Sequence, residues 1–227
     1  MPRVARAIAV GYPHHITQRG NYRQAVFVEE DDYLRYVEIL SVFAPKYGLD
    51  IWAYCLMPNH VHIVGVPGSQ DTLAKTFNTV HMLYAQYFNK KRNVTGHLWQ
   101  GRFYSCVLDP HHLYAAVRYV ELNPVRSGIV SIAHDYPWSS AKAHLTREPN
   151  PLLSGRCPLV QKIQDWAGYL GEEPDQEAVD AVIQATKSGR PCGTKDFILQ
   201  MEGLLNRRLA PNPRGRPVKS AKKEKEV

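Results

Sequence analysis

Two well-separated stretches carry side chains that could do chemistry together. In His60-Val61-His62 the imidazoles are two residues apart, so on a β-strand both point to the same face. Tyr119 and Asn123 are four residues apart, which makes them neighbours on one face of a helix. Imidazoles and a carboxamide oxygen can bind a divalent metal such as Mg²⁺ or Mn²⁺, and a phenol can attack phosphorus. The combination favours cleavage of a phosphodiester bond.

Each pair also has an ordinary structural interpretation. His60 and His62 could be half-buried histidines that hydrogen-bond within the fold. Tyr119 could be a core aromatic residue, and Asn123 could be a helix C-cap before Pro124. A free phenol has a pKa of ~10, so attack by the tyrosine requires activation, which a nearby metal would provide.

Rival chemistries fit less well. Histidine-triad nucleotide hydrolases need a third alternating histidine, but Val64 occupies that position. Two-histidine phosphoesterases need two H-x-T/S units; His15-Ile16-Thr17 supplies one, whereas His62-Ile63-Val64 does not supply the other. Tyr114 is a second tyrosine near Tyr119, but its offset puts it on a different helix face from Asn123.

The charge of the chain points to a polyanionic partner. The formal net charge is +7, and residues 187–227 contain 11 Lys or Arg against 4 Asp or Glu. Such a basic segment favours nucleic acid, although it could also be a solubilising tail. Within it, Arg214-Gly215-Arg216-Pro217 resembles the core of an AT-hook, which inserts arginine into the minor groove.

Further candidate contacts to nucleic acid lie at the ends of predicted elements. They are arginines that could meet phosphates, namely Arg19, Arg23, Arg102 and Arg126. Trp99, Phe103 and Tyr104 are interleaved with polar residues, which suits a base-stacking platform but also suits a packed strand end.

The composition indicates a globular protein of one domain, or one domain with an appendage. Of the 227 residues 44% are hydrophobic, no apolar run approaches the ~20 residues of a membrane span, and no secretion signal is recognisable. We therefore expect a cytoplasmic protein without contact to a membrane. The four cysteines are scattered and predict neither a zinc knuckle nor a disulfide framework.

The periodicity of the chain predicts an order β-α-β-β-α-β-α. Strands are expected over 6–17, 49–54, 60–66 and 98–108, and helices from Asp31 or Asp32 to the region of Pro45 and Gly48, over 72–90 and over 111–122. The last helix is expected to stop at Asn123-Pro124, because the residue before a proline disfavours helical geometry. This order predicts an α+β, ferredoxin-like fold, an antiparallel sheet with helices on one face. We assign it to residues 1–148, followed by a small helical, basic extension (149–209) and a basic tail (210–227).

Five ordered motifs make the chain resemble the REP-associated tyrosine transposases, which are relatives of the single-tyrosine HUH transposases. The motifs span roughly residues 9–145 and are Gln18-Arg19-Gly20-Asn21, Leu56-Met57-Pro58-Asn59-His60-Val61-His62, Gly96-His97-Leu98-Trp99-Gln100-Gly101-Arg102, Tyr119-Val120-Glu121-Leu122-Asn123-Pro124-Val125-Arg126 and Tyr136-Pro137-Trp138-Ser139-Ser140. The last third of the chain resembles the family only through its basic character.

The resemblance implies a ferredoxin-like HUH fold with His60 and His62 as ligands of a divalent metal and Tyr119 as the nucleophile. The third ligand would be Asn123, where the insertion-sequence relatives have glutamine. The resemblance further implies recognition of single-stranded DNA hairpins and cleavage through a 5′-phosphotyrosine that leaves a 3′-hydroxyl.

The resulting hypothesis is a metal-dependent DNA transposase in which Arg19 and Arg102 steady the DNA backbone and the tail grips the hairpin. Two alternatives are a non-catalytic DNA- or RNA-binding regulator and a metal nuclease that uses water. The oligomeric state stays open between monomer and homodimer.

Overall fold

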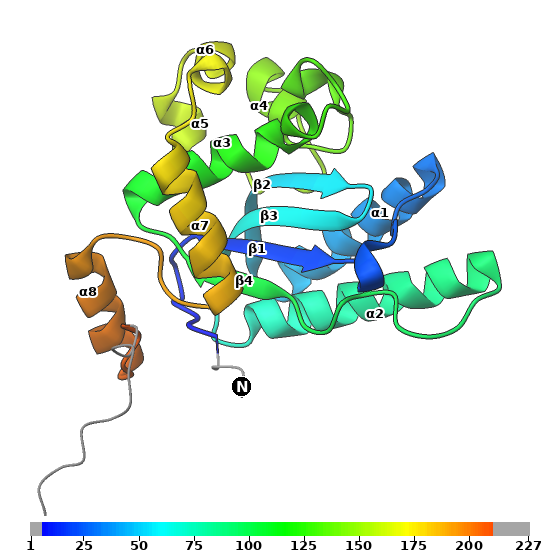
Figure 1. Cartoon of the computed structure of the whole chain (residues 1–227), viewed down its shortest axis with the longest axis horizontal. Coiled ribbons are helices and arrows are strands. Elements are labelled where there is room, and N and C mark those ends of the chain that lie inside the picture. The colour runs from blue at the N-terminus through cyan, green and yellow to red at the C-terminus, as the bar shows by residue number, and fades with distance from the viewer. Residues whose placement is uncertain (1–5, 211–227) are drawn as a thin grey trace, which may run out of the picture.

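Antiparallel strands form one sheet in the order β2-β3-β1-β4 in the computed structural model, which describes residues 6–210. The strands are β1 (His14–Arg19), β2 (Leu49–Met57), β3 (His60–Pro67) and β4 (Tyr104–Val107). Helix α1 (Glu30–Lys46) connects β1 to β2, and helix α2 (Thr72–Arg92) connects β3 to β4, as Figure 1 shows. This order of elements and strands confirms the predicted ferredoxin-like α+β fold.

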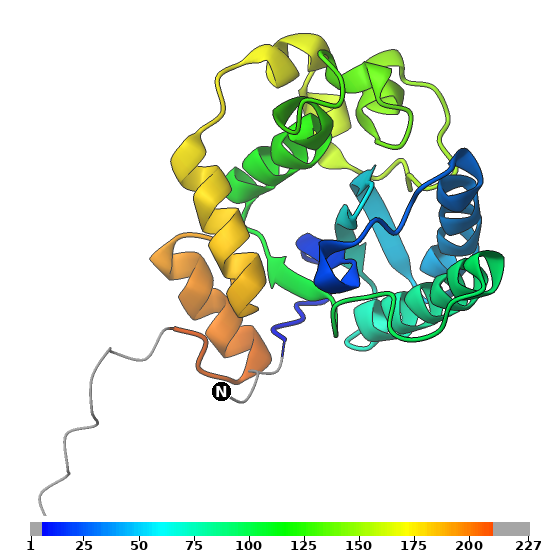
Figure 2. The ribbon, with the colours of Figure 1, turned by 45° about the vertical axis from the view of Figure 1, so that its right-hand side comes forward.

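Different helices cover the two faces of the sheet (Figures 1 and 2). The pair α1 and α2 packs on the face that carries Ile16 and Ile63, as predicted. The other face, which carries Cys55 and Val64, is covered by α3 (Pro110–Arg126) and α7 (Gln176–Ser188). The expectation of helices on one face alone therefore needs correction. Nearly every residue of the central strand β3 is buried, which is the pattern of a sheet covered on both sides.

Two predicted strands are shorter than expected. Before β1 the chain turns at Gly11, whose φ of 79° favours glycine, so β1 begins at His14 rather than near residue 6. The predicted strand over 98–108 is regular only from Tyr104 to Val107. Ahead of it, Trp99 forms a single antiparallel bridge with Gly20.

The boundaries of two helices also differ from prediction. In α1, Glu29 is the N-cap and Asp32 completes a capping box, and Pro45 lies within the helix. In α3, the helix does not stop at Asn123-Pro124 but continues to Arg126. Proline lacks the N–H that would bond the carbonyl four residues earlier, and the packing of α3 on the sheet outweighs this loss. Asn123 is consequently a helical residue and not a C-cap.

The C-terminal segment consists of short helices that share a core with the sheet. Its further elements are η2 (Ala133–Asp135), α4 (Ala141–Thr146), α5 (Pro158–Lys162), α6 (Trp166–Gly171) and α8 (Lys195–Leu205). One short 3-10 helix, η1 (Asn21–Arg23), lies elsewhere, directly after β1. Trp166 of α6 and Val182 of α7 are buried in the same cluster as Cys55 and Val64. The domain boundary at 148/149 stays a prediction.

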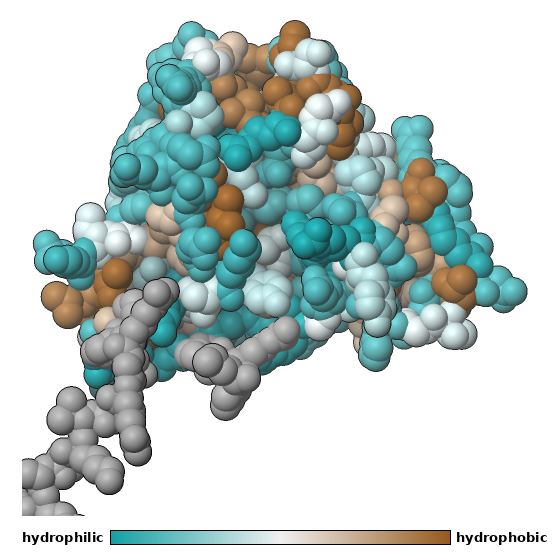
Figure 3. Space-filling model, viewed as in Figure 1, coloured by the Kyte–Doolittle hydropathy of each residue, from teal (hydrophilic) through white to brown (hydrophobic). Residues whose placement is uncertain are grey.

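The surface seen in Figure 3 is largely hydrophilic, and hydrophobic side chains gather at its upper end, over α4 and α6. Within residues 6–210, no helix is long and apolar enough to cross a membrane. Arg214 and Arg216, with nearly all of the predicted tail, lie outside the described residues.

Candidate active site

The two histidines of β3 lie on the sheet face that α3 and α7 cover. In the antiparallel pairing of β3 with β1, His60 is opposite Arg19 and His62 is opposite Thr17. Residues opposite one another in an antiparallel pair share a face, so these side chains point toward the same space. The same-face geometry that the H-x-H spacing predicted is therefore present, and the central strand β1 contributes to it.

Helix α3 brings Tyr119 over the histidines. The centroid of its ring lies 5.3 Å from that of His62 and 6.0 Å from that of His15, edge-on in both cases. The guanidinium of Arg126 lies 5.5 Å from the centroid of the Tyr119 ring. The buried side chain of Asn123 donates from its amide nitrogen to the Tyr119 carbonyl at 2.9 Å, so a cation would be met by its amide oxygen.

A pocket of about 430 Å³ opens where these elements meet. It is lined by residues of β1, β3, β4, α3, α7 and the segment before β4, namely His15, Thr17, Arg19, His62, Gln100, Tyr104, Tyr119, Ile183, Thr186 and Lys187. One wall therefore comes from α7, which belongs to the C-terminal extension.

Both histidines of the H-x-H pair have their Nδ1 atoms in hydrogen bonds. Nδ1 of His60 lies 2.5 Å from Oδ1 of Asn59, and Nδ1 of His62 lies 2.9 Å from Nε2 of His15. Nε2 of His62 is buried and has no hydrogen-bond partner among residues 6–210. A buried nitrogen without a partner is costly unless something else binds it. Metal-bound histidines typically have their second ring nitrogen held in this way, so the residues fit a divalent cation.

Burial keeps these imidazoles neutral, the form that binds metal. It lowers the pKa of His60 to about 4, with a further contribution from the charge of Arg19. Burial likewise holds the pKa of His62 well below its usual value, assisted by His60, His15 and Arg19. Among residues 6–210, no three His, Cys, Asp or Glu side chains form a metal-binding group, so the candidate set is two imidazoles and an amide.

Opposing effects act on the pKa of Tyr119, the candidate nucleophile. Burial raises the pKa of the Tyr119 phenol, whereas the nearby Asn123 amide and the charges of Arg126 and Arg19 lower it. The arginines thus favour the phenolate, although desolvation is the larger effect. Attack by this oxygen therefore calls for additional positive charge next to it.

The remaining predicted DNA contacts are distributed unevenly. Arg19 lines the pocket and Arg126 lies against Tyr119, whereas Arg102 lines a separate hollow beside α2. Trp99 is only 8% exposed, and its indole N–H donates to the carbonyl of His81 at 3.0 Å. Trp99 has little surface left for stacking on a base, which favours the packed strand end that the sequence left open.

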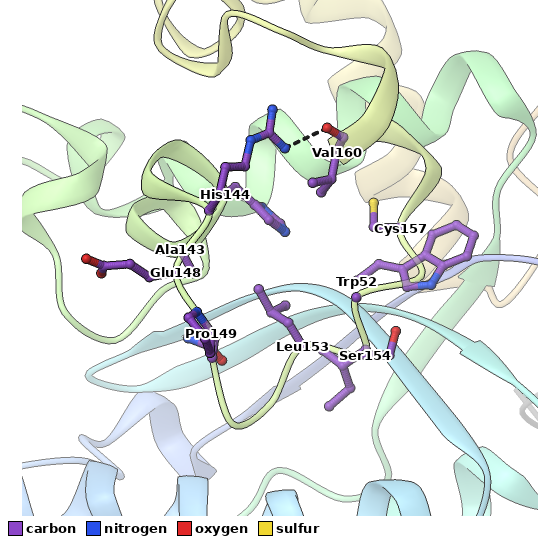
Figure 4. Close-up of a pocket in the computed structure, with 13 residues that line it drawn as sticks. Trp52, Ala143, His144, Glu148, Pro149, Leu153, Ser154, Cys157 and Val160 are labelled. Carbon is purple, nitrogen blue, oxygen red and sulfur yellow. Dashed lines mark hydrogen bonds between the residues drawn. The ribbon is translucent and has the colours of Figure 1, made fainter.

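Two other hollows contain no member of the predicted metal and nucleophile set. Tyr114 lines one of them together with Arg118, away from His62, which agrees with its expected position on another helix face. Figure 4 shows the second, of about 370 Å³, between Trp52 of β2 and the segment around His144. There a hydrogen bond from the Arg147 guanidinium to the Val160 carbonyl closes one side.

Among the pocket residues that sequence reasoning missed, two are joined to His62 by hydrogen bonds. His15 was noted only as part of a phosphoesterase-like unit, yet its strand position opposite Val64 places it on the histidine face. Thr186 hydrogen-bonds to His15 at 2.7 Å, and no local pattern of α7 could have indicated this contact.

Comparisons with known proteins point to one family. The family described as "Transposase IS200 like" matches residues 10–123, half of the chain. A Haemophilus influenzae protein described as a REP-associated tyrosine transposase is 28% identical over 133 residues, which are 54% of this chain and 69% of that protein. A solved structure described as a REP-associated tyrosine transposase bound to a REP hairpin has a TM-score of 0.53 at 20% identity, covering 68% of this chain and 92% of the other.

These matches confirm the resemblance on which the sequence motifs converged. The solved structure supports the fold, and the family match includes both histidines, Tyr119 and Asn123. Membership implies a DNA-cleaving enzyme. The chain belongs to the family of IS200-like transposases.

Proposed function

We propose that this transposase cleaves and rejoins single-stranded hairpin DNA through a covalent bond between Tyr119 and a 5′-phosphate. The observation that carries the proposal is the position of the Tyr119 ring, 5.3 Å from His62, in a pocket where Nε2 of His62 has no partner among the described residues. A purely structural role for Tyr119 and His62 would leave this unpaired buried nitrogen unexplained.

In the proposed reaction, the phenol oxygen of Tyr119 attacks the scissile phosphorus and the bond from phosphorus to the 3′-oxygen breaks. The phenol loses one proton and the departing 3′-oxygen gains one, so protons balance. The new phosphotyrosine ester retains the energy of the original bond. A 3′-hydroxyl can therefore attack it later, release the phenol and rejoin the strands without ATP.

The chain's own residues prepare this step. The charges of Arg19 and Arg126 favour the phenolate and could also contact phosphate oxygens. His60, His62 and Asn123 would hold a divalent cation, Mg²⁺ or Mn²⁺, which when bound would neutralise phosphate oxygens and favour the charged phenol. The amide of Asn123 is next to Tyr119 on α3, which suits a ligand that must lie close to the nucleophile.

Hairpin DNA is proposed as the substrate because the similar solved structure is described as bound to a REP hairpin. We propose further phosphate contacts by Arg102 and, outside the described residues, by Arg214 and Arg216. Deleting residues 211–227 should weaken DNA binding and flatten its dependence on salt, because fewer counterions would be released. A salt slope that stays unchanged would remove the tail from the interface.

The deciding experiment uses labelled hairpin DNA with Mn²⁺ and compares the parent protein with Tyr119→Phe. The parent should form an adduct that survives denaturation, and Tyr119→Phe should form none. Tyr114→Phe is the matched control, because it removes a hydroxyl from the same helix but away from the pocket, and it should retain the adduct. Cleavage that continues in Tyr119→Phe would refute the tyrosine mechanism and favour a hydrolytic nuclease. DNA binding without cleavage by the parent would favour a regulator.

A further inference from the structure

A line of buried hydrogen bonds runs from α7 to the candidate metal ligand on β3. Thr186 Oγ1 lies 2.7 Å from His15 Nδ1, and His15 Nε2 lies 2.9 Å from His62 Nδ1. The three residues are 2%, 1% and 5% exposed. Water therefore has little access to these contacts, so the hydrogen bonds among the three side chains determine where their protons lie.

The hydroxyl of Thr186 sets the direction of the whole line. It donates to the Val182 carbonyl at 2.7 Å, one turn earlier in α7. A hydroxyl has a single proton, so Thr186 must accept the hydrogen bond from His15 Nδ1–H. Cys106 Sγ, 3.2 Å from Thr186 Oγ1, can act as the donor in its contact and leaves this assignment unchanged.

The assignment continues to His62. A neutral imidazole has one N–H and one lone pair, so His15 accepts at Nε2 once Nδ1 donates. His62 must then carry its proton on Nδ1 and donate to His15. Nε2 of His62 is left with a lone pair, and this is the buried atom without a partner among residues 6–210.

We propose that His15 and Thr186 are positioning residues that fix the tautomer of His62, so that Nε2 presents its lone pair to a divalent cation. This inference rests on the proposed function, because it concerns the same metal site. Partners of the second nitrogen of a metal-bound histidine fix its tautomer and ring orientation, and losing one typically costs about 10–100-fold in metal affinity. Since Thr186 lies in α7, the C-terminal extension completes the metal site.

The test uses the full chain without DNA and measures two quantities. Nitrogen NMR of the histidine rings in metal-free protein reports the tautomer of His62, assigned with a His62→Gln variant. Calorimetric titration with Mn²⁺ reports the affinity. Thr186→Val removes the hydroxyl at nearly constant volume, and Thr186→Ser keeps the hydroxyl. Thr76→Val is the matched control, because Thr76 is also buried but its hydroxyl has no partner among the described residues.

The parent should hold His62 with its proton on Nδ1. Thr186→Val should give a mixture of the two tautomers and weaken Mn²⁺ binding about 10–100-fold, the range for a lost partner of a metal-bound histidine. Thr186→Ser and Thr76→Val should resemble the parent in both measurements. An unchanged tautomer in Thr186→Val, or a proton on Nε2 of His62 in the parent, overturns the proposal, and the second measurement is decisive even if Thr186→Val does not fold.

Failure of the proposed metal site and failure of the positioning pair would give different combinations of results. A parent that has the expected tautomer but takes up no Mn²⁺ would refute the metal site and leave the positioning pair intact. Normal Mn²⁺ uptake with an unchanged tautomer in Thr186→Val would refute the positioning pair and leave the metal site intact.

Discussion

Replacing Glu121 with glutamine should destabilise the protein by loosening the helix that carries Tyr119. The Glu121 carboxylate is fully buried. Its Oε1 accepts hydrogen bonds from Ser140 Oγ at 2.5 Å and from His144 Nδ1 at 2.6 Å, and its Oε2 accepts from Trp166 Nε1 at 2.8 Å. This one side chain of α3 thus forms hydrogen bonds with Ser140, which precedes α4, with His144 of α4 and with Trp166 of α6.

The expected loss follows from counting donors. Glutamine keeps one oxygen, which can serve Ser140 and His144, but its amide nitrogen cannot accept from Trp166. The indole N–H and the amide protons are then buried without partners, and each such group costs about 1–3 kcal/mol. Removing a buried charge offsets part of this cost. We expect the free energy of unfolding to fall by about 2–4 kcal/mol.

Urea unfolding followed by circular dichroism would measure this loss for Glu121→Gln, Trp166→Phe and the double variant. Because Trp166 has already lost its acceptor in the glutamine variant, the two losses should not add, and the coupling should be about 1–2 kcal/mol. The exposed Glu148→Gln, a control for the chemical change itself, should stay within about 0.5 kcal/mol of the parent. A Glu121→Gln variant as stable as this control, or losses that add fully, would refute the reasoning.

Three further changes test other parts of the structure. Although burial alone would raise the pKa of Asp32, hydrogen bonds from Arg92, the backbone and Lys91 lower it to about 2; Asp32→Asn should cost roughly 1–2 kcal/mol after allowance for partly exposed partners. That stability is present above the ordinary aspartate pKa and is lost as pH falls through about 2. The free energies of unfolding of the parent and of Asp32→Asn should therefore differ at neutral pH and converge near pH 2. In Gly20→Ala the new Cβ would lie 2.4 Å from the backbone oxygen of Gln24. We expect a lower melting temperature in thermal unfolding or a displaced loop in a crystal structure. A variant with neither change would contradict this close contact. Asn59→Ala, which frees Nδ1 of His60, should weaken Mn²⁺ binding about tenfold by calorimetry, and unchanged binding would exclude Asn59 as a partner of a metal ligand.

Most of the fold was predictable because its signals are local. The helical periodicity of 72–90 and the strand patterns of 49–54 and 60–66 predicted α2, β2 and β3 close to their observed positions. Prediction was wrong where a local preference was outweighed by the surroundings. The preference of Asn123 to leave the helix before Pro124 is weaker than the packing of α3 on the sheet, so the helix continues.

The pairing of residues within the site was predictable only in part. The faces of β3 and α3 follow from strand and helix periods, so His62 and Tyr119 could be placed on surfaces before the fold was known. That these surfaces face each other depends on α3 packing on the second face of the sheet, whereas the sequence predicted helices on one face alone. The contact of Thr186 with His15 joins residues far apart in sequence through the packing of α7, and single-sequence patterns contain no information about such contacts.

Several of the family motifs contribute hydrogen bonds that hold the elements of the candidate site together. Gly20 donates its N–H to the carbonyl of Asn59 at 2.8 Å, which ties the end of β1 to the turn before His60. Tyr136 Oη donates to the Leu56 carbonyl at 2.7 Å, and Ser140 binds Glu121, so the last motif braces β2 and α3 together. The histidines and the tyrosine lie on different elements, and a metal and a nucleophile must be held within fractions of an ångström.

The C-terminal extension also holds the candidate site together, although it lies beyond the part of the chain that the family match covers. Residues 10–123 contain the proposed metal ligands and the proposed nucleophile, but Thr186 and Lys187 of α7 form part of the wall of the pocket that His62 and Tyr119 line. Trp166 of α6 donates a hydrogen bond to Glu121 of α3, the helix that carries Tyr119, so both α6 and α7 contact the elements of the candidate site. A fragment that ends near residue 148 would expose the buried surface of α3 and leave His15 Nδ1 without its acceptor. We therefore expect the extension to be required for an ordered site.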